Sequence, residues 1–384
     1  MPASAAAEEL EERLQRLERR LEDLQGKLSR QGELIADQAA TIERLRQQRS
    51  AQQATGSAPA GHPGSNGRFQ DISVGGLVEV EGGYADGSDG EGRSDLVLAS
   101  VELTLGAQIN DWFSTQIVFL HEDEETDFGV DEGTITLANP EHTPLFVTAG
   151  RMYVPFGAFE TNMVSDPLTL ELGETRETAL QAGFEQGRWS GSVYTFNGDT
   201  NQAGSADHVE HWGANLRFTH ATQDGELSLG LGFINSLGDS DALQDALTDA
   251  AGMQDRVPGV VAHGLWRSGP WSLIGEYLTA TQRFDVTDLA FAGAGAKPSA
   301  WNVEAGFGFR VAGRDTVLAL GFQGTDEALA LALSEERYLV TWAIDLKEHT
   351  ALKIEWAHDK GYASSVGATG STANTGTAQI AVEF

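Results

Sequence analysis

The feature that most constrains this chain is a long series of short segments in which apolar and polar residues alternate. In RYLVTWAIDLK, residues 337–347, Tyr338, Val340 and Trp342 alternate with other residues, and this period of two recurs from residue 69 onward. The pattern is typical of β-strands with one apolar and one polar face. We predict about sixteen strands. They span residues 69–85, 94–109, 112–122, 132–138, 145–155, 176–186, 188–198, 208–222, 225–237, 256–268, 270–284, 299–312, 315–325, 335–347, 349–361 and 376–384.

The connections between these strands alternate in length. Every second one is very short: ND, NPEHT, QGR, TQDGE, RSGP, AGRD and KEHT. The others are mostly long and often acidic, and they include DGSDGEGRSD at 86–95, HEDEETDFGVDE at 121–132 and the stretch 156–175. Short turns at one end and long loops at the other are the plan of a bacterial outer-membrane barrel. The prediction is an all-β transmembrane barrel of about sixteen antiparallel strands around a water-filled lumen.

The last segment, TAQIAVEF at 377–384, alternates up to a terminal aromatic residue. A strand left as an open edge invites aggregation, and closing a barrel removes that edge. We therefore expect this strand to pair with the first one, near residues 69–85. Its final Phe384 resembles the C-terminal assembly signal of outer-membrane barrels. Alternation alone also fits a soluble sandwich, but Trp and Tyr near strand ends, such as Trp112, Trp189 and Trp271, favour an interface with lipid.

Composition excludes several classes of protein. The chain has 384 residues, no cysteine and a formal net charge of −32, so it has neither a disulfide framework nor a thiolate site. Residues 1–67 hold 9 of the 25 basic and 10 of the 57 acidic residues, so nearly all the excess charge lies in the predicted barrel. Such a field disfavours nucleic acid. The sequence has no Gly-x-Ser-x-Gly or His-Glu-x-x-His motif and its histidines are scattered, so we expect no enzyme.

The first 67 residues differ from the rest. Leu10, Leu14, Leu17, Leu21 and Leu24 follow heptad spacing, which continues to about residue 49 and predicts a coiled coil over 8–49. We therefore divide the chain into a periplasmic coiled coil (1–49), a flexible linker (50–67) and a barrel (68–384). A homotrimer is the preferred assembly. The start, MPASAAAEEL, lacks the plan of a secretory signal, so the barrel interpretation requires that a leader has been removed.

One stretch is more specific than a generic barrel. Residues 148–185 read TAGRMYVPFGAFETNMVSDPLTLELGETRETALQAGFE, with LVEVEGGY at 77–84 and VYTFNGD at 193–199. Together these segments closely resemble the LbtU-type siderophore porins, and the likeness extends over most of 69–384 and includes the leading coiled coil. Membership would imply an outer-membrane channel associated with uptake of iron–siderophore complexes. GRMYVPFG has a weaker likeness to phosphate-selective porins.

The third long connection, by its prolines and its length, is expected to fold back into the lumen. It would form a constriction from Arg151, Tyr153, Glu160, Asp166, Glu171, Glu174, Arg176 and Glu177. Further lumen-facing candidates are Arg217, Glu304, Arg310, Arg337, Asp345 and Lys353. Rings of carboxylates favour cations, so a cation-preferring pore is predicted. The alternative is a loop that merely packs against the wall, with its carboxylates solvated or paired to arginine.

These observations predict an outer-membrane porin for passive passage of small hydrophilic solutes, iron–siderophore complexes among the candidates. No plug module precedes the barrel in this reading, which argues against energised import. The alternative is a structural protein that tethers the membrane to the cell wall through residues 8–49. Lipid and lipopolysaccharide are the expected surroundings. We expect no cofactor, with calcium or magnesium at most held loosely by the acidic outer loops. DHVEHW at 207–212 offers His208 and Glu210 on one face, too few ligands for a metal site.

Overall fold

The computed structural model describes residues 71–86, 92–123, 126–205 and 208–384. All of them belong to the second of two compact units, Gly67–Phe384. The predicted coiled coil and linker lie outside the described residues and stay predictions.

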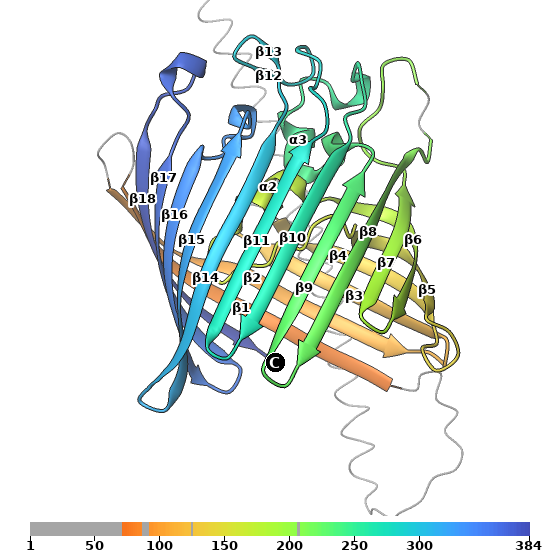
Figure 1. The fold of residues 1–384 in the computed structure, drawn as a ribbon, viewed down its shortest axis with the longest axis vertical. Helices are drawn as coiled ribbons and strands as arrows, with labels where there is room; N and C mark the ends of the chain where they lie inside the picture. The colour runs from red at the N-terminus through yellow and green to blue at the C-terminus, as the bar shows by residue number, and fades with distance from the viewer. Residues whose placement is uncertain (1–70, 87–91, 124–125, 206–207) are drawn as a thin grey trace, which may run out of the picture. The chain divides into compact units, whose positions relative to one another are not determined.

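Sixteen strands of the described chain form one closed antiparallel barrel, which confirms the predicted fold (Figure 1). Each strand pairs with its neighbours in the chain, and the first pairs with the last. The strands are β1 (Asp71–Asp86), β2 (Gly92–Gln108), β3 (Phe113–Glu122), β4 (Thr126–Ala138), β5 (Leu145–Tyr153), β6 (Arg176–Gln186), β7 (Trp189–Phe196), β8 (His211–Thr222), β9 (Gly225–Ile234), β10 (Gly259–Ser268), β11 (Trp271–Ala280), β14 (Ser299–Val311), β15 (Arg314–Asp326), β16 (Glu336–Lys347), β17 (Thr350–Lys360) and β18 (Thr372–Glu383).

The remaining elements lie in the connections. They are the short hairpin of β12 (Ala290–Phe291) and β13 (Ala294–Gly295), the helices α2 (Leu168–Gly173) and α3 (Asp241–Ala246), and the 3-10 turns η1 (Leu237–Asp239), η2 (Ala250–Gly252), η3 (Leu329–Leu331) and η4 (Ser364–Val366). None of the described helices is long and apolar enough to cross a membrane.

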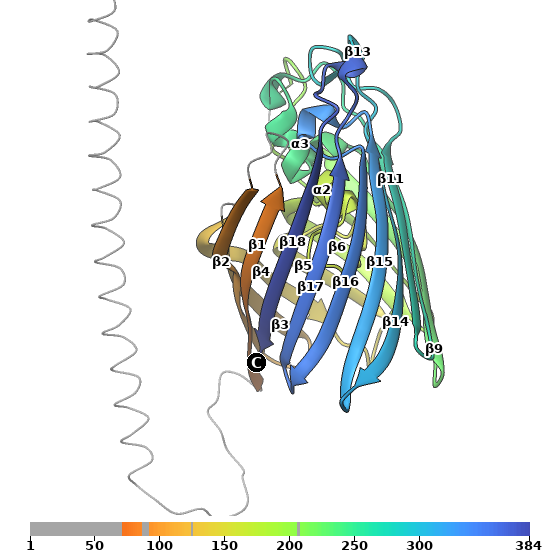
Figure 2. The same cartoon turned by 90° about the vertical axis from the view of Figure 1, so that its left-hand side faces the viewer.

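The barrel closes where β1 meets β18, as the sequence predicts. Val80 lies opposite Ile380, and the two strands stay in register over ten residue pairs (Figure 2). Beyond the last pair, Phe384 N donates to Gly76 O at 3.0 Å and Gly76 N donates to Phe384 O at 2.9 Å. The backbone groups of β18 are therefore satisfied on both sides, by β17 and by β1.

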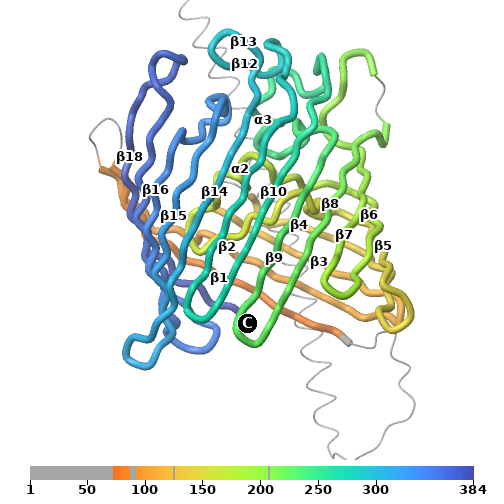
Figure 3. Tube along the Cα trace, in the orientation of Figure 1, coloured from red at the N-terminus to blue at the C-terminus, as the bar shows by residue number. Residues whose placement is uncertain are grey.

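The long connections gather at one end of the barrel, here called the mouth, and the short turns gather at the other (Figure 3). Several strand boundaries differ from the sequence prediction, and the largest difference is at β4. Most of 121–132 is strand rather than loop, because β4 begins at Thr126, and β2 begins at Gly92 instead of 94. In β4, Phe128 and Val130 are exposed while Asp131 is buried. An acidic residue that faces the inside of a barrel does not interrupt a strand, and this run was wrongly assigned to a loop.

The outer surface of the wall is apolar. Side chains that alternate with the inward ones are exposed on nearly every strand, and among them are Ile72, Leu96, Ile135, Leu231 and Val303. Trp189, Trp212, Trp266, Trp271 and Trp356 are also exposed. Such a belt, continuous around a cylinder, is the surface that a barrel presents to lipid.

A hydrophobic cluster fills part of the barrel below the mouth. It joins the third loop to the later long connections and to the wall of β6, β7 and β9–β14. Its most deeply buried members include Phe156, Leu172, Phe196, Ile234, Leu237, Leu243 and Leu278. This packing occupies one side of the lumen and leaves the side of β1–β4 and β18 for water.

Candidate functional site

The third loop, residues 154–175, leaves the wall after β5 and runs through the inside of the barrel. Its helix α2 lies within the ring of strands in both views (Figures 1 and 2). Leu168 and Leu172 of α2 are fully buried. The loop returns at Thr175, whose carbonyl oxygen accepts from Val154 N at 2.9 Å. The backbones of β5 and β6 thus stay paired as far as Val154 and Thr175, and the residues between these two fold inward.

Three glutamates of the opposite wall hold the loop by its backbone. Glu276 of β11 accepts from Ala158 N at 2.9 Å and from Phe159 N at 3.2 Å. Glu304 of β14 accepts from Asn162 N at 2.7 Å. Carboxylates that accept hydrogen bonds from backbone N–H groups bind strongly because the bonds are charge-assisted.

The third glutamate completes the row. Glu355 of β17 accepts from Val164 N at 2.6 Å and Ser165 N at 3.1 Å, and the hydroxyl of Ser165 donates to it as well. Gln323 of β15 adds a further acceptor, Oε1, for Leu168 N at 3.2 Å. The three carboxylates are almost completely buried, so their charge is directed at the loop rather than at a passing solute.

The space that the loop leaves open is a strongly acidic cavity of about 1240 Å³. It is bounded by β1–β6 and β18, by the third loop and by α3. Thirteen acidic and two basic side chains line this acidic cavity. The acidic ones are Glu79, Glu81, Glu102, Glu122, Asp123, Asp131, Glu132, Asp166, Glu171, Glu174, Asp199, Asp241 and Asp245, and the basic ones are Arg151 and Arg176.

Six of the eight residues predicted for the constriction line this cavity: Arg151, Tyr153, Asp166, Glu171, Glu174 and Arg176. The other two do not. Glu160 lies 3.7 Å from Arg267 Nη2, on a part of the loop that faces β10. Glu177 points between the mouth loops, with Oε1 buried and without a hydrogen-bond donor among the described residues. Of the predicted acidic residues of the loop, those in its second half, Asp166, Glu171 and Glu174, therefore line the cavity.

A seam in the wall lies beside this constriction. Pairing of β4 with β5 ends at Gly133 and Arg151, although β4 extends further toward the mouth. Beyond that point side chains replace the backbone ladder. Asp131 of β4 forms an ion pair with Arg176 of β6, and Tyr153 Oη donates to Asp131 at 3.3 Å. Asp131 is nearly buried, so this network closes the gap between the strands.

Glu174 is a strongly perturbed carboxyl group of the third loop. It caps the C-terminus of α2, and its carbonyl oxygen accepts from Asp241 N at 3.0 Å. Burial raises the pKa of Glu174 to about 8, and the nearby carboxylates of Asp241 and Asp166 raise it further. Burial likewise raises the pKa of Asp241. Glu174 and Asp241 thus resist ionisation mainly because burial disfavours their charged forms.

The predicted lumen-facing residues lie on the inner side of the wall, but most of them form hydrogen bonds or ion pairs with other residues of the protein. Glu304 is an anchor of the third loop, and Lys353 Nζ donates to Met163 O of that loop at 3.4 Å. Arg337 pairs with Asp359 at 2.7 Å, and Arg310 pairs with Asp315 at 2.7 Å near the short turns. The remaining two, Arg217 and Asp345, lie outside the residues that line the acidic cavity.

The histidine segment at the mouth does not assemble a metal site. His211 is buried with its Nδ1 3.2 Å from Asp239 Oδ2, and Glu210 pairs with Arg256 at 2.9 Å. Among the described residues, no group of three or more histidine, aspartate or glutamate side chains is arranged to hold a metal ion.

Sequence reasoning missed the wall side of the pore. Glu79, Glu81 and Glu102 alternate with apolar residues in LVEVEGGY and SVELTL, so the period of two already placed them on the polar face. It also missed Glu276 and Glu355, the partners of Glu304. Their role depends on where a loop more than a hundred residues away meets the wall, and no local pattern encodes that.

The barrel has the fold of outer-membrane porins. Similar solved structures include an anion-selective porin from Comamonas acidovorans (TM-score 0.59, 14% identity, 82% of this chain and 99% of that one). The outer membrane channel DcaP of Acinetobacter baumannii is similar as well (TM-score 0.58, 14% identity, 82% and 97%). So is OmpT of Vibrio cholerae in its trimer form (TM-score 0.51, 11% identity, 82% and 99%).

Curated relatives are more similar in sequence, although no family model matches the chain. A UPF0422 protein of Coxiella burnetii is 28% identical over 306 residues, which are 77% of this chain and 65% of that protein. A UPF0422 protein of Legionella pneumophila (strain Lens) is 29% identical over 331 residues, 76% of this chain and 62% of that protein. The chain thus spans 62–65% of the length of these relatives.

Proposed function

We propose that the chain forms an outer-membrane channel that gives small hydrophilic solutes passive passage and prefers cations. The porin fold and the apolar outer belt support insertion into a membrane. The excess of carboxylates in the acidic cavity carries the preference. Acidic groups on both the loop side and the wall side leave an anion no favourable path, whereas they concentrate cations.

The proposal extends to assembly and to the solute. The trimer form of OmpT supports a homotrimer for this chain. The likeness to LbtU-type siderophore porins makes iron–siderophore complexes candidate solutes. Because the acidic cavity repels anions, the candidates are complexes without net negative charge. Ion pairs such as Arg176–Asp131 use part of the basic charge that an anionic chelate would need.

The test is the reversal potential of the detergent-purified protein in a planar bilayer under a potassium chloride gradient. We expect cation preference, because potassium ions are attracted to the thirteen carboxylates of the acidic cavity. Conductance steps arriving in threes would support the trimer. Preference for chloride would contradict the assignment of the acidic cavity as the conducting path.

A tethering role remains the second candidate, and a truncation separates the two. Removing residues 1–67 leaves the whole described barrel, so a channel keeps its conductance and its selectivity. If the protein is a tether, the truncated variant instead fails to attach the outer membrane to the cell wall, whether or not it conducts. A truncated barrel that inserts and stays silent would favour the tether.

A further inference from the structure

The inner face of β1–β4 changes character along the strands. Toward the mouth it carries Glu79, Glu102 and Glu122, which line the acidic cavity. Four to six residue pairs closer to the short turns, the described inward side chains carry no carboxylate. There Ser73 lies opposite Gly106, and Gln116 lies between Gly106 on one side and Thr134 on the other. A solute moving through the barrel along this wall leaves an acidic zone and enters an uncharged polar one.

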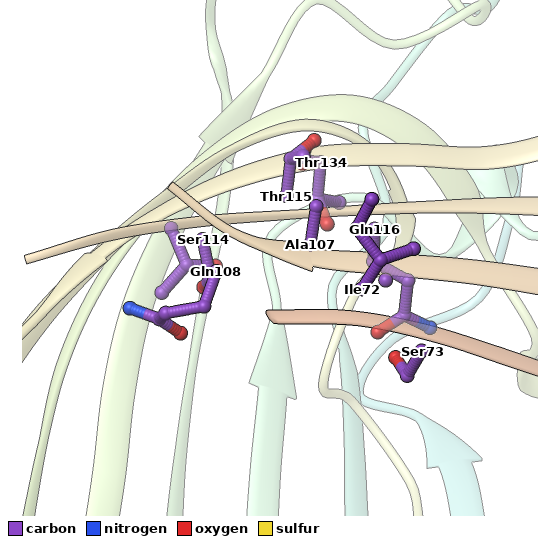
Figure 4. Close-up of a pocket in the computed structure, with 10 residues that line it drawn as sticks. Ile72, Ser73, Ala107, Gln108, Ser114, Thr115, Gln116 and Thr134 are labelled. Carbon is purple, nitrogen blue, oxygen red and sulfur yellow. The ribbon is translucent and has the colours of Figure 1, made fainter. Parts of the chain in front are cut away.

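A second cavity of about 580 Å³ lies at this uncharged zone (Figure 4). The described residues that line it are all uncharged: they are Ile72, Ser73, Gly106, Ala107, Gln108, Ser114, Thr115, Gln116, Thr134 and Thr136. Gln116 lines this neutral cavity and the acidic cavity alike, so the two adjoin at this residue.

The neutral cavity retains unused hydrogen-bonding groups. Thr115 Oγ1 donates to Thr134 O, and Thr136 pairs with Thr148, so these hydroxyls have partners. The side chains of Ser73, Ser114 and Gln116 make no hydrogen bond to the residues that the structure describes. Hydroxyl and amide groups both donate and accept. They therefore suit a solute with hydroxyl or amide groups, and they offer little to a bare inorganic cation.

The acidic cavity holds a different kind of unused group. Gln379 is 3% exposed, and its Nε2 donates to Glu81 Oε1 at 2.8 Å. Its Oε1 is buried and has no donor. A buried carbonyl oxygen without a donor is costly, so a ligand that donates there is stabilised. Beside it stand the carboxylates of Glu81 and Glu79, which also line the cavity. An ammonium group has three donors for such a set of oxygens.

We propose that the solute selected by this pore is an organic ammonium compound that also carries hydroxyl or amide groups, of the amino-sugar or small cationic peptide kind. This inference rests on the proposed channel. Glu81 and Gln379 bind the ammonium group first, and the neutral cavity then binds the polar body. Glu81 and Ser73 are eight residues apart on β1, about 26 Å at 3.3 Å per residue, so a small solute occupies the sites in turn.

The experiment measures block of single-channel potassium current by three probes added to the wild-type trimer. Glucosamine carries both an ammonium group and hydroxyl groups. Ethylammonium carries only the ammonium group, and glucose carries only hydroxyl groups. Because the two sites are occupied in turn, we expect glucosamine to give two kinds of blocking event, one shared with ethylammonium at Glu81 and Gln379 and one shared with glucose at the neutral cavity, whereas each of the other probes gives one kind. Glucosamine events that match those of ethylammonium alone would overturn the role of the neutral cavity.

Variants separate the two sites. Q379L and E81Q should weaken glucosamine and ethylammonium while leaving glucose unchanged, whereas Q116L should weaken glucosamine and glucose alone. D345N, a lumen-side carboxylate outside both cavities, is the matched control for loss of one charge. Any other pattern contradicts the assignment. The wild-type probe series decides the question even if a variant does not fold. The cation preference in potassium chloride is measured before any probe is added. A channel without this preference would contradict the proposed function itself rather than the inference about the solute.

Discussion

The three glutamates that hold the third loop allow a quantitative prediction for E304Q. In the native protein, Glu304 Oε1 accepts from Thr161 Oγ1 at 2.6 Å and from Asn302 Nδ2 at 3.0 Å. Its Oε2 accepts from Asn162 N at 2.7 Å and from Asn162 Nδ2 at 3.0 Å. In the amide, one of the two oxygens becomes an NH2 group that cannot accept, so the two bonds made there are lost or must reverse their direction, and the other two lose the charge of their acceptor.

A hydrogen bond to a charged acceptor contributes about 1.5–3 kcal/mol to stability. The lower end applies here, since water in the lumen can solvate the released loop donors. Two bonds then amount to about 3 kcal/mol, which shifts the equilibrium between the docked and the released loop segment by about a hundredfold. Glu276 and Glu355 still hold the flanking segments, so the release is local to residues 160–163.

The assay is single-channel recording of E304Q beside wild type and D345N. We expect E304Q to flicker between conductance levels, because a released segment moves in and out of the pore on the timescale of loop motion. D345N removes a lumen-side carboxylate that makes no hydrogen bond with the described third loop, so its trace should match wild type. A quiet trace for E304Q at wild-type conductance would refute the claim that this carboxylate fixes the loop.

Three other perturbations have defined outcomes. Because burial raises the pKa of Glu174 to about 8, its charge is present above that pH and lost below it. The cation preference, measured as the reversal potential, should therefore increase between pH 6 and 9.5 in wild type and increase less in E174Q. D131N breaks the ion pair that closes the seam; since Arg176 is 22% exposed, the loss should be about 1–3 kcal/mol, below that of a fully buried pair, and appear as a lower melting temperature by circular dichroism. Gly150 has φ of 142°, and a Cβ there would lie 2.0 Å from Gly133 O, so G150A should abolish the folded, heat-modifiable band on gels, while G187A, in an open turn, should retain it.

The strands could be predicted from sequence because lipid and water impose opposite demands on alternate residues. Val340 and Thr341 satisfy those demands locally, so their faces follow from the period of two. The start of β4 differs from the prediction for a related reason: Asp131 looks like a loop residue, although an acidic side chain is compatible with the polar inner face of a barrel strand. The closing pair of strands followed from a physical need to remove open edges.

The site was less predictable, since its residues act through partners far away in the chain. Glu304 looked like a pore carboxylate, and its inward direction was correct, but its contact with Asn162 spans 142 residues. Glu160 lies on the loop as expected yet faces Arg267, because the path of the loop is determined by packing of Phe156 and Leu172 and by the wall glutamates that hold its backbone. Local composition showed an acidic loop and could not show which of its acids line the cavity.

The closure of the barrel by β1 and β18 has a consequence for biogenesis. Gln379 and Glu81 are hydrogen-bonded although 298 residues separate them in the chain. The wall of the barrel therefore stays open until nearly the whole barrel sequence has been synthesised. Before that moment the nascent sheet has two bare edges, each a template for pairing with another chain. Correct folding therefore requires that these two distant segments avoid pairing with other strands until they meet each other.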